Sequence, residues 1–144
     1  MRWLEFGLVL ALVLGVGTGA AKAQEQRIDV ELMVSHLTSA DGEIDPRGQK
    51  LHRKLQSQFR YESLRVLQIR GLRLAMDEVG SVGLPNGKSV RVQPLQVSGS
   101  GVLLAVDVEG AARMDLKVRK GHLVVIGAER YQDGKLVISL EPRW

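Results

Sequence analysis

Turn residues interrupt the second half of this 144-residue chain at short intervals, and this spacing restricts the fold more than any other feature. The signals are Asn86-Gly87, Ser98-Gly99-Ser100-Gly101, Glu109-Gly110, Lys120-Gly121 and Asp133-Gly134. The segments between them alternate apolar and polar residues, the pattern of half-buried strands. Turns spaced roughly 8–14 residues apart predict an antiparallel meander, a sandwich or a partial barrel. The last two signals are predicted to be hairpin turns.

Further strands are predicted on both sides of the chain's midpoint. Residues 28–36 (IDVELMVSH) alternate with period two, which indicates a half-buried strand. The alternation changes phase between Val66 and Leu67, which indicates either a β-bulge or a strand that is exposed differently at its two ends. Residues 102–108 (VLLAVDV) are apolar enough to form a central strand.

One helix is predicted near the N-terminus, at about residues 46–59. Asp45-Pro46 offers an N-cap followed by a proline in the first helical position. Leu51, Leu55 and Phe59 then recur every four residues and form one apolar stripe. The predicted fold class is α+β: mainly antiparallel β-sheet, as a sandwich or partial barrel, with one amphipathic helix.

The first residues resemble an export signal. Arg2 precedes the apolar run Leu8 to Val16, and Ala21-Lys22-Ala23 fits an A-x-A cleavage site. We therefore expect a signal peptide at 1–23 and a single β-rich domain at 24–144, located in the periplasm, at the outer membrane or outside the cell. An uncleaved anchor is the alternative. The chain has no cysteine, so a lipid-anchored form is not expected.

Charge and motifs argue against several classes of function. Removal of Arg2, Lys22 and Glu5 with the leader lowers the net charge from +4 to +3, and the charges are spread out. Nucleic-acid binding is therefore not predicted. The three histidines lack metal-ligand spacing, and no nucleophile–base or paired-carboxylate motif is visible. The chain is predicted to be non-enzymatic, without cofactor or metal.

The predicted helix is basic and is the strongest candidate contact surface. It could meet anionic lipid headgroups or an acidic protein face, although such a set is often a solvated helix face. Tyr131 is a candidate aromatic contact. The candidate partner-contacting residues are Arg47, Lys50, Arg53, Lys54 and Tyr131.

Three segments together resemble the closing strands of secretins, the outer-membrane channels of type II and III secretion and of type IV pili. They are 87–97 (GKSVRVQPLQV), 102–108 and 114–127 (MDLKVRKGHLVVIG). Ala128 replaces the second glycine of the family's G-G pair, and Leu123 replaces a threonine. The ring-building, membrane-spanning and gate segments are missing. The resemblance therefore implies a reduced secretin-like core, linked to a secretion or pilus system, rather than a complete channel.

Two functions remain open from the sequence. The favoured one is an envelope protein that associates with another envelope protein, or with itself, through an exposed sheet edge. In that case 114–127 and 136–140 would form a terminal hairpin in one sheet with 102–108, with Lys117, Arg119 and Lys120 protecting the edge. The alternative is a free-standing periplasmic domain that binds a small ligand or peptide in a β-cleft.

Overall fold

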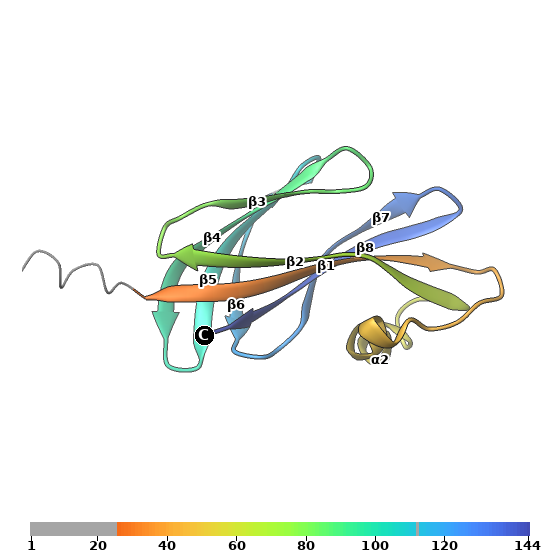
Figure 1. The fold of residues 1–144 in the computed structure, drawn as a ribbon, viewed down its shortest axis with the longest axis horizontal. Coiled ribbons are helices and arrows are strands. Elements are labelled where there is room, and N and C mark those ends of the chain that lie inside the picture. The colour runs from red at the N-terminus through yellow and green to blue at the C-terminus, as the bar shows by residue number, and fades with distance from the viewer. Residues whose placement is uncertain (1–25, 112) are drawn as a thin grey trace, which may run out of the picture.

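The computed structural model describes residues 26–111 and 113–144, which form two four-stranded antiparallel sheets (Figure 1). The predicted signal peptide lies outside the described residues. Sheet A has the strand order β2 (Ser63–Ala75), β1 (Arg27–Thr38), β8 (Gly134–Arg143) and β7 (Val124–Tyr131). Sheet B has the order β3 (Gly80–Gly83), β4 (Ser89–Ser98), β5 (Gly101–Val108) and β6 (Met114–Arg119).

The two sheets pack face to face as a β-sandwich. Alternate residues of β1 and β8 point toward sheet B, where they meet the inward residues of β4 and β5. The fully buried residues of this sandwich core are Ile28, Val30, Leu32, Val34, Val90, Val92, Val102, Leu104, Val106, Leu136, Ile138 and Leu140. The predicted fold class is confirmed, and the sandwich is the form it takes.

A short helical segment covers the other face of sheet A. The 3₁₀ turn η2 (Pro46–Gly48) leads into α2 (Gln49–Leu55), between β1 and β2. The Asp45 side chain caps η2 by accepting a hydrogen bond from the Arg47 N–H, as Asp45-Pro46 predicts. The second core beneath the helix comprises Met33, Leu37, Leu51, Leu55, Leu64, Val66 and Val137.

The helix is shorter than the predicted 46–59. It ends at Leu55, and Phe59 packs against the second core from the segment that follows. Four-residue spacing of apolar residues continues past the last helical turn because the loop also contributes to this core. Within the described residues, no helix is long and apolar enough to cross a membrane.

Two further predictions about the strands are confirmed. Ser35 pairs with Val66 and Val34 pairs with Gln68, so Leu67 is the extra residue of a bulge in β2. β5 is an interior strand of sheet B, paired with β4 and β6 along its length.

The prediction for Lys120-Gly121 is wrong. This turn carries the chain from β6 in sheet B to β7 in sheet A, so it is a crossing between sheets and not a hairpin. Consequently 136–140 does not share a sheet with 102–108. A hairpin turn and a sheet-to-sheet crossing both need a tight reversal, and the local sequence does not distinguish them. The final turn is a hairpin, in which Gln132 adopts a positive φ of 52°.

Candidate binding surfaces

Arg47 is held in place by contacts within the chain. Its guanidinium donates to the Asp45 carboxylate, with an Nη2–Oδ2 distance of 2.8 Å, and to the Val66 carbonyl at 3.1 Å. The Val66 N–H in turn donates to Asp45 Oδ2. The hydrogen bonds from Arg47 and Val66 hold the pKa of Asp45 far below its ordinary value. This cluster fastens the start of the helical segment to β2.

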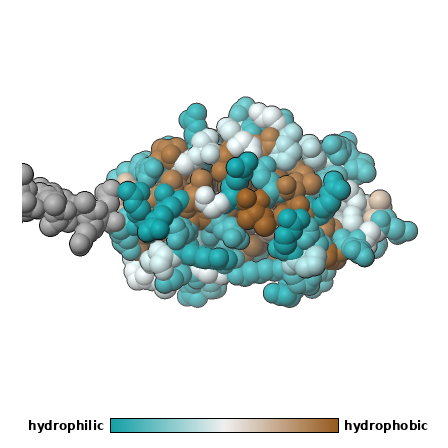
Figure 2. All heavy atoms as spheres, in the orientation of Figure 1, coloured by the Kyte–Doolittle hydropathy of each residue, from teal (hydrophilic) through white to brown (hydrophobic). Residues whose placement is uncertain are grey.

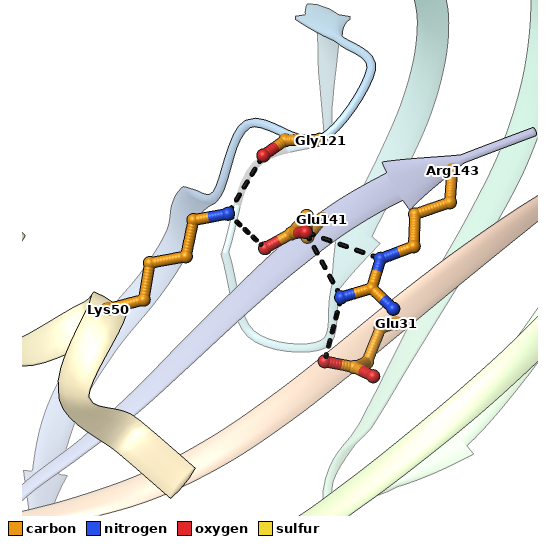
Figure 3. A network of polar contacts seen from close by, with 5 residues as sticks. All are labelled: Glu31, Lys50, Gly121, Glu141 and Arg143. Carbon is orange, nitrogen blue, oxygen red and sulfur yellow. Dashed lines mark hydrogen bonds and ion pairs between the residues drawn. The ribbon is translucent and has the colours of Figure 1, made fainter. Parts of the chain in front are cut away.

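Lys50 belongs to a second structural network (Figure 3). Its ammonium donates to Glu141 Oε1 and to the Gly121 carbonyl, both at 2.8 Å. Arg143 donates to Glu141 Oε2 at 3.2 Å and reaches Glu31 Oε1 at 4.0 Å. Burial alone would raise the pKa of Glu141, whose side chain is 9 % exposed, but the hydrogen bonds and charges of Lys50 and Arg143 hold that pKa below its ordinary value. The network joins α2 to β8 and to the sheet-to-sheet crossing.

The other predicted contact residues lie on two separate surfaces. Arg53 and Lys54, together with Lys50, line an open groove of about 370 Å³ beside Gly121 and His122. Tyr131 lies at the end of β7, where its ring meets His36 edge-on at 5.3 Å. The structure therefore does not gather the five predicted residues into one site.

The edge of sheet A at β2 is the longest strand edge in the described structure, and both of its ends are closed. At one end Asp45 and Glu43 bond the backbone of Leu64, and the Asp45 carboxylate accepts from Val66 N–H. At the other end Glu78 Oε1 accepts from Ala75 N–H at 2.9 Å. These side chains and loops satisfy backbone groups that would otherwise face solvent.

Between those caps, residues 68–73 form an open edge. An antiparallel pairing with β1 uses the backbone groups of alternate residues, so the intervening groups point away from the sheet. Within residues 26–111 and 113–144, these outward backbone groups have no hydrogen-bond partner. Ile69 is 41 % exposed here, and Arg70, Gly71 and Arg73 are exposed beside it. Figure 2 shows hydrophobic atoms reaching the surface at the middle of the molecule, where β1 and β2 cross the view in Figure 1.

The remaining edges are each protected. β3 has only four residues, and β7 is bulged at Ile126. β6 exposes Asp115, Lys117 and Arg119 along its length. Short length, bulges and charge are the usual means of preventing unwanted strand pairing. Lys117 and Arg119 thus lie on an edge strand as predicted, whereas Lys120 follows the strand and lies over the Trp144 ring.

The open edge of β2 was not among the sequence-based candidates. Three arginines, at 65, 70 and 73, mark it in the sequence, but an interior strand with polar ends gives a similar pattern. Comparisons of the chain with protein-family models, with curated proteins and with solved structures find no match.

Proposed function

We propose that this chain is an exported, non-enzymatic envelope domain that binds an extended segment of a partner protein along the open edge of β2. The observation that supports this proposal is the gap in the hydrogen-bonded edge at residues 68–73, between the Asp45 and Glu78 caps. An added strand would bond the outward N–H and C=O groups, and its side chains would meet those of β2.

The charges around this edge favour an acidic partner. Arg65 and Arg70 lie opposite His36 and Leu32 of β1, so both point to the same face of sheet A. Within the described residues, none of the three arginines makes an ion pair, although Arg73 lies opposite Asp29 in the register. A partner strand with acidic residues on one face and apolar residues on the other would complement Arg70 and Ile69.

A second copy of this chain is the less favourable occupant. Pairing β2 with β2 would bring two sets of three arginines together at one edge, and like charges across a strand pair are destabilising. The resemblance to secretins also implies association in the envelope, with a different protein or with the same chain.

Proline substitution at Gly71 tests the proposal without removing a side chain. The Ala75 N–H points outward to Glu78, so by the alternation of an antiparallel edge strand the Gly71 N–H also points outward, whereas the Arg70 N–H points toward β1. Gly71→Pro removes only an outward group and should keep a nearly normal melting temperature, whereas Arg70→Pro also breaks the pairing with β1 and removes an arginine of the proposed surface. An acetylated peptide of alternating glutamate and valine should bind the wild-type chain, and a lysine–valine peptide should not.

We expect the stable proline variant to lose the acidic peptide in a fluorescence-anisotropy titration. Unchanged affinity in that variant, or equal binding of the two peptides, would contradict the proposal. Light scattering on the same proteins tests self-association: a dimer that disappears in the stable proline variant would identify a second copy, not an acidic partner, as the occupant.

A further inference from the structure

A cavity of about 430 Å³ opens beside the β7–β8 turn. This turn lies at the end of the molecule that also holds α2 (Figure 1). Three separate segments line it: the end of β1, residues 59–61 after the helix, and the β7–β8 hairpin. The hairpin is packed tightly against β1, because a Cβ at Gly134 would collide with the Leu37 carbonyl. Two of the three walls, β1 and the β7–β8 hairpin, are therefore fixed relative to one another.

Three cationic side chains converge on this cavity. Arg60 comes from the segment after α2, Arg130 from β7 and Lys135 from β8. Within the described residues, none of the three makes an ion pair with a carboxylate. Asp133 is the acidic residue in the lining, and its carboxylate lies 3.6 Å from His36 Nε2. The cavity thus concentrates positive charge that the chain itself does not neutralise.

Aromatic rings form one wall of the same cavity. The Phe59 ring lies 4.9 Å from the Lys135 ammonium, a cation–π contact that orients the lysine. Tyr61 is fixed by a 2.7 Å hydrogen bond between its hydroxyl and His52 Nδ1, and the two rings meet edge-on at 5.6 Å. Thr38, Ser39 and Gln132 add polar groups around the opening.

We infer that this cavity binds a small anion that carries a flat, apolar ring, with its carboxylate or phosphate placed among Arg60, Arg130 and Lys135. Guanidinium groups recognise both kinds of anion through paired N–H donors. A ring would lie against Phe59 and Tyr61. The volume lies within the range of small-molecule sites. The inference is independent of the β2 edge, which lies on a different part of the chain.

Calorimetric titration with three probes tests the proposed chemistry. Phenyl phosphate carries both the ring and the anion, inorganic phosphate carries only the anion, and benzyl alcohol carries only the ring. We expect phenyl phosphate to bind most tightly and benzyl alcohol not to bind. Equal affinities for phenyl phosphate and inorganic phosphate would show that the ring adds no binding energy, and would contradict a ligand whose ring lies against Phe59 and Tyr61.

Matched double variants separate this site from general positive charge. Arg60→Gln with Arg130→Gln should weaken phenyl phosphate binding about tenfold or more, because each change removes a charge-assisted hydrogen bond to the anion. Arg53→Gln with Lys54→Gln removes the same charge from the groove beside Gly121 and should change the affinity less than about threefold. Equal losses of phenyl phosphate affinity in the two double variants would contradict the proposed site and would indicate non-specific attraction by positive charge.

Co-sedimentation with phosphatidylglycerol vesicles distinguishes a lipid headgroup from a free ligand as the source of the anion. If the Arg60/Arg130 variant loses vesicle binding and the Arg53/Lys54 variant keeps it, the anion that the cavity binds is a lipid headgroup. Vesicle binding that is unaffected by the Arg60/Arg130 change, together with loss of phenyl phosphate binding, assigns it to a free small molecule.

Discussion

Sheets A and B have four strands each, but they bury their residues differently. In β5 of sheet B, Val102, Leu104 and Val106 face the sandwich core and are buried, while Leu103 on the other face is partly exposed. In β8 of sheet A both faces are covered, by sheet B on one side and by α2 on the other, so seven consecutive residues from Leu136 to Pro142 are buried. The comparison shows that the helical segment, rather than the sandwich itself, turns the two central strands of sheet A, β1 and β8, into an interior layer.

The largest expected difference is between a charge buried inside the fold, beneath α2 or in the sandwich core, and a charge on the outer face of sheet B. Val137→Asp in sheet A would bury an unpaired carboxylate beneath α2 and should cost about 4 kcal/mol or more, as should Val106→Asp in the sandwich core. Leu103→Asp on the outer face of sheet B should cost less than about 1 kcal/mol, because it is partly solvated and lies opposite Lys117. Urea unfolding measures all three. Similar losses for Val137 and Leu103 would show that the two outer faces do not differ.

A smaller effect tests the helix as the cover of sheet A. Leu51 is fully buried in the second core, so Leu51→Ala should lower the free energy of unfolding by about 2–5 kcal/mol. Arg53→Ala on the exposed side of the same helix should change it by less than about 0.5 kcal/mol. Chemical denaturation of both variants measures the difference, and a Leu51 variant as stable as the Arg53 variant would mean that α2 contributes little packing.

The network at Glu141 in sheet A should make the stability of the fold depend on acid. A carboxylate whose folded-state pKa is depressed stabilises the fold above its unfolded-state pKa, and that contribution is lost as the pH falls. Glu141→Gln should therefore destabilise the chain by about 1–3 kcal/mol at neutral pH. The difference from wild type should shrink below pH 4.5, the ordinary value for this group. Melting temperatures measured from pH 7 to pH 3 test this; a difference that stays constant over that range would contradict the role given to Lys50 and Arg143.

The smallest effect concerns two buried hydroxyl groups on the helix-covered face of sheet A. Ser35 Oγ and Ser139 Oγ are buried and have no hydrogen-bond partner in the described structure. Ser139→Ala removes a group that lost its hydration on burial, so it should be neutral or stabilising by up to about 1 kcal/mol. The matched control is Ser81→Ala, at an exposed position of β3 in sheet B, which should leave the stability unchanged. Thermal unfolding compares the two variants, and a clear loss of stability at Ser139 would indicate that its hydroxyl has a partner.

Most strands could be predicted from the sequence, but their distribution between sheets could not. Alternation identified β1, the apolar content of residues 102–108 identified the central position of β5, and the phase change at Leu67 pointed to a bulge as one of two alternatives, because each of these is a local pattern. The choice between hairpin and crossing at Lys120-Gly121 depends on which distant strand has a free edge. Here that strand is β8, which pairs with β1 on one side and offers its other side to β7, and no residue of the turn determines this pairing.

The candidate surfaces were harder to predict than the fold. The basic residues of the helix were identified, but Arg47 and Lys50 bond to Asp45 and Glu141, and Glu141 is more than ninety positions away from Lys50 in the chain. The cavity near Arg60 and Arg130 unites segments that only the β1–β8 pairing brings together. The sequence shows which residues are basic, but it does not show which of them are already bonded to a carboxylate of the same chain.

The pairing of β1 with β8 sets the order in which this chain can complete its fold. All of sheet B lies within residues 80–119, and each strand pairs with its neighbour in the sequence, so its contacts form by closing short loops. β1 and β8 meet only after a loop of 95 residues between Thr38 and Gly134 has closed. Contacts between residues so far apart in the sequence slow folding, so we expect sheet B to form early and β8 to pair with β1 last. Until it does, the sandwich core and the core beneath α2 are both incomplete, and β1 presents an unpaired edge to its surroundings.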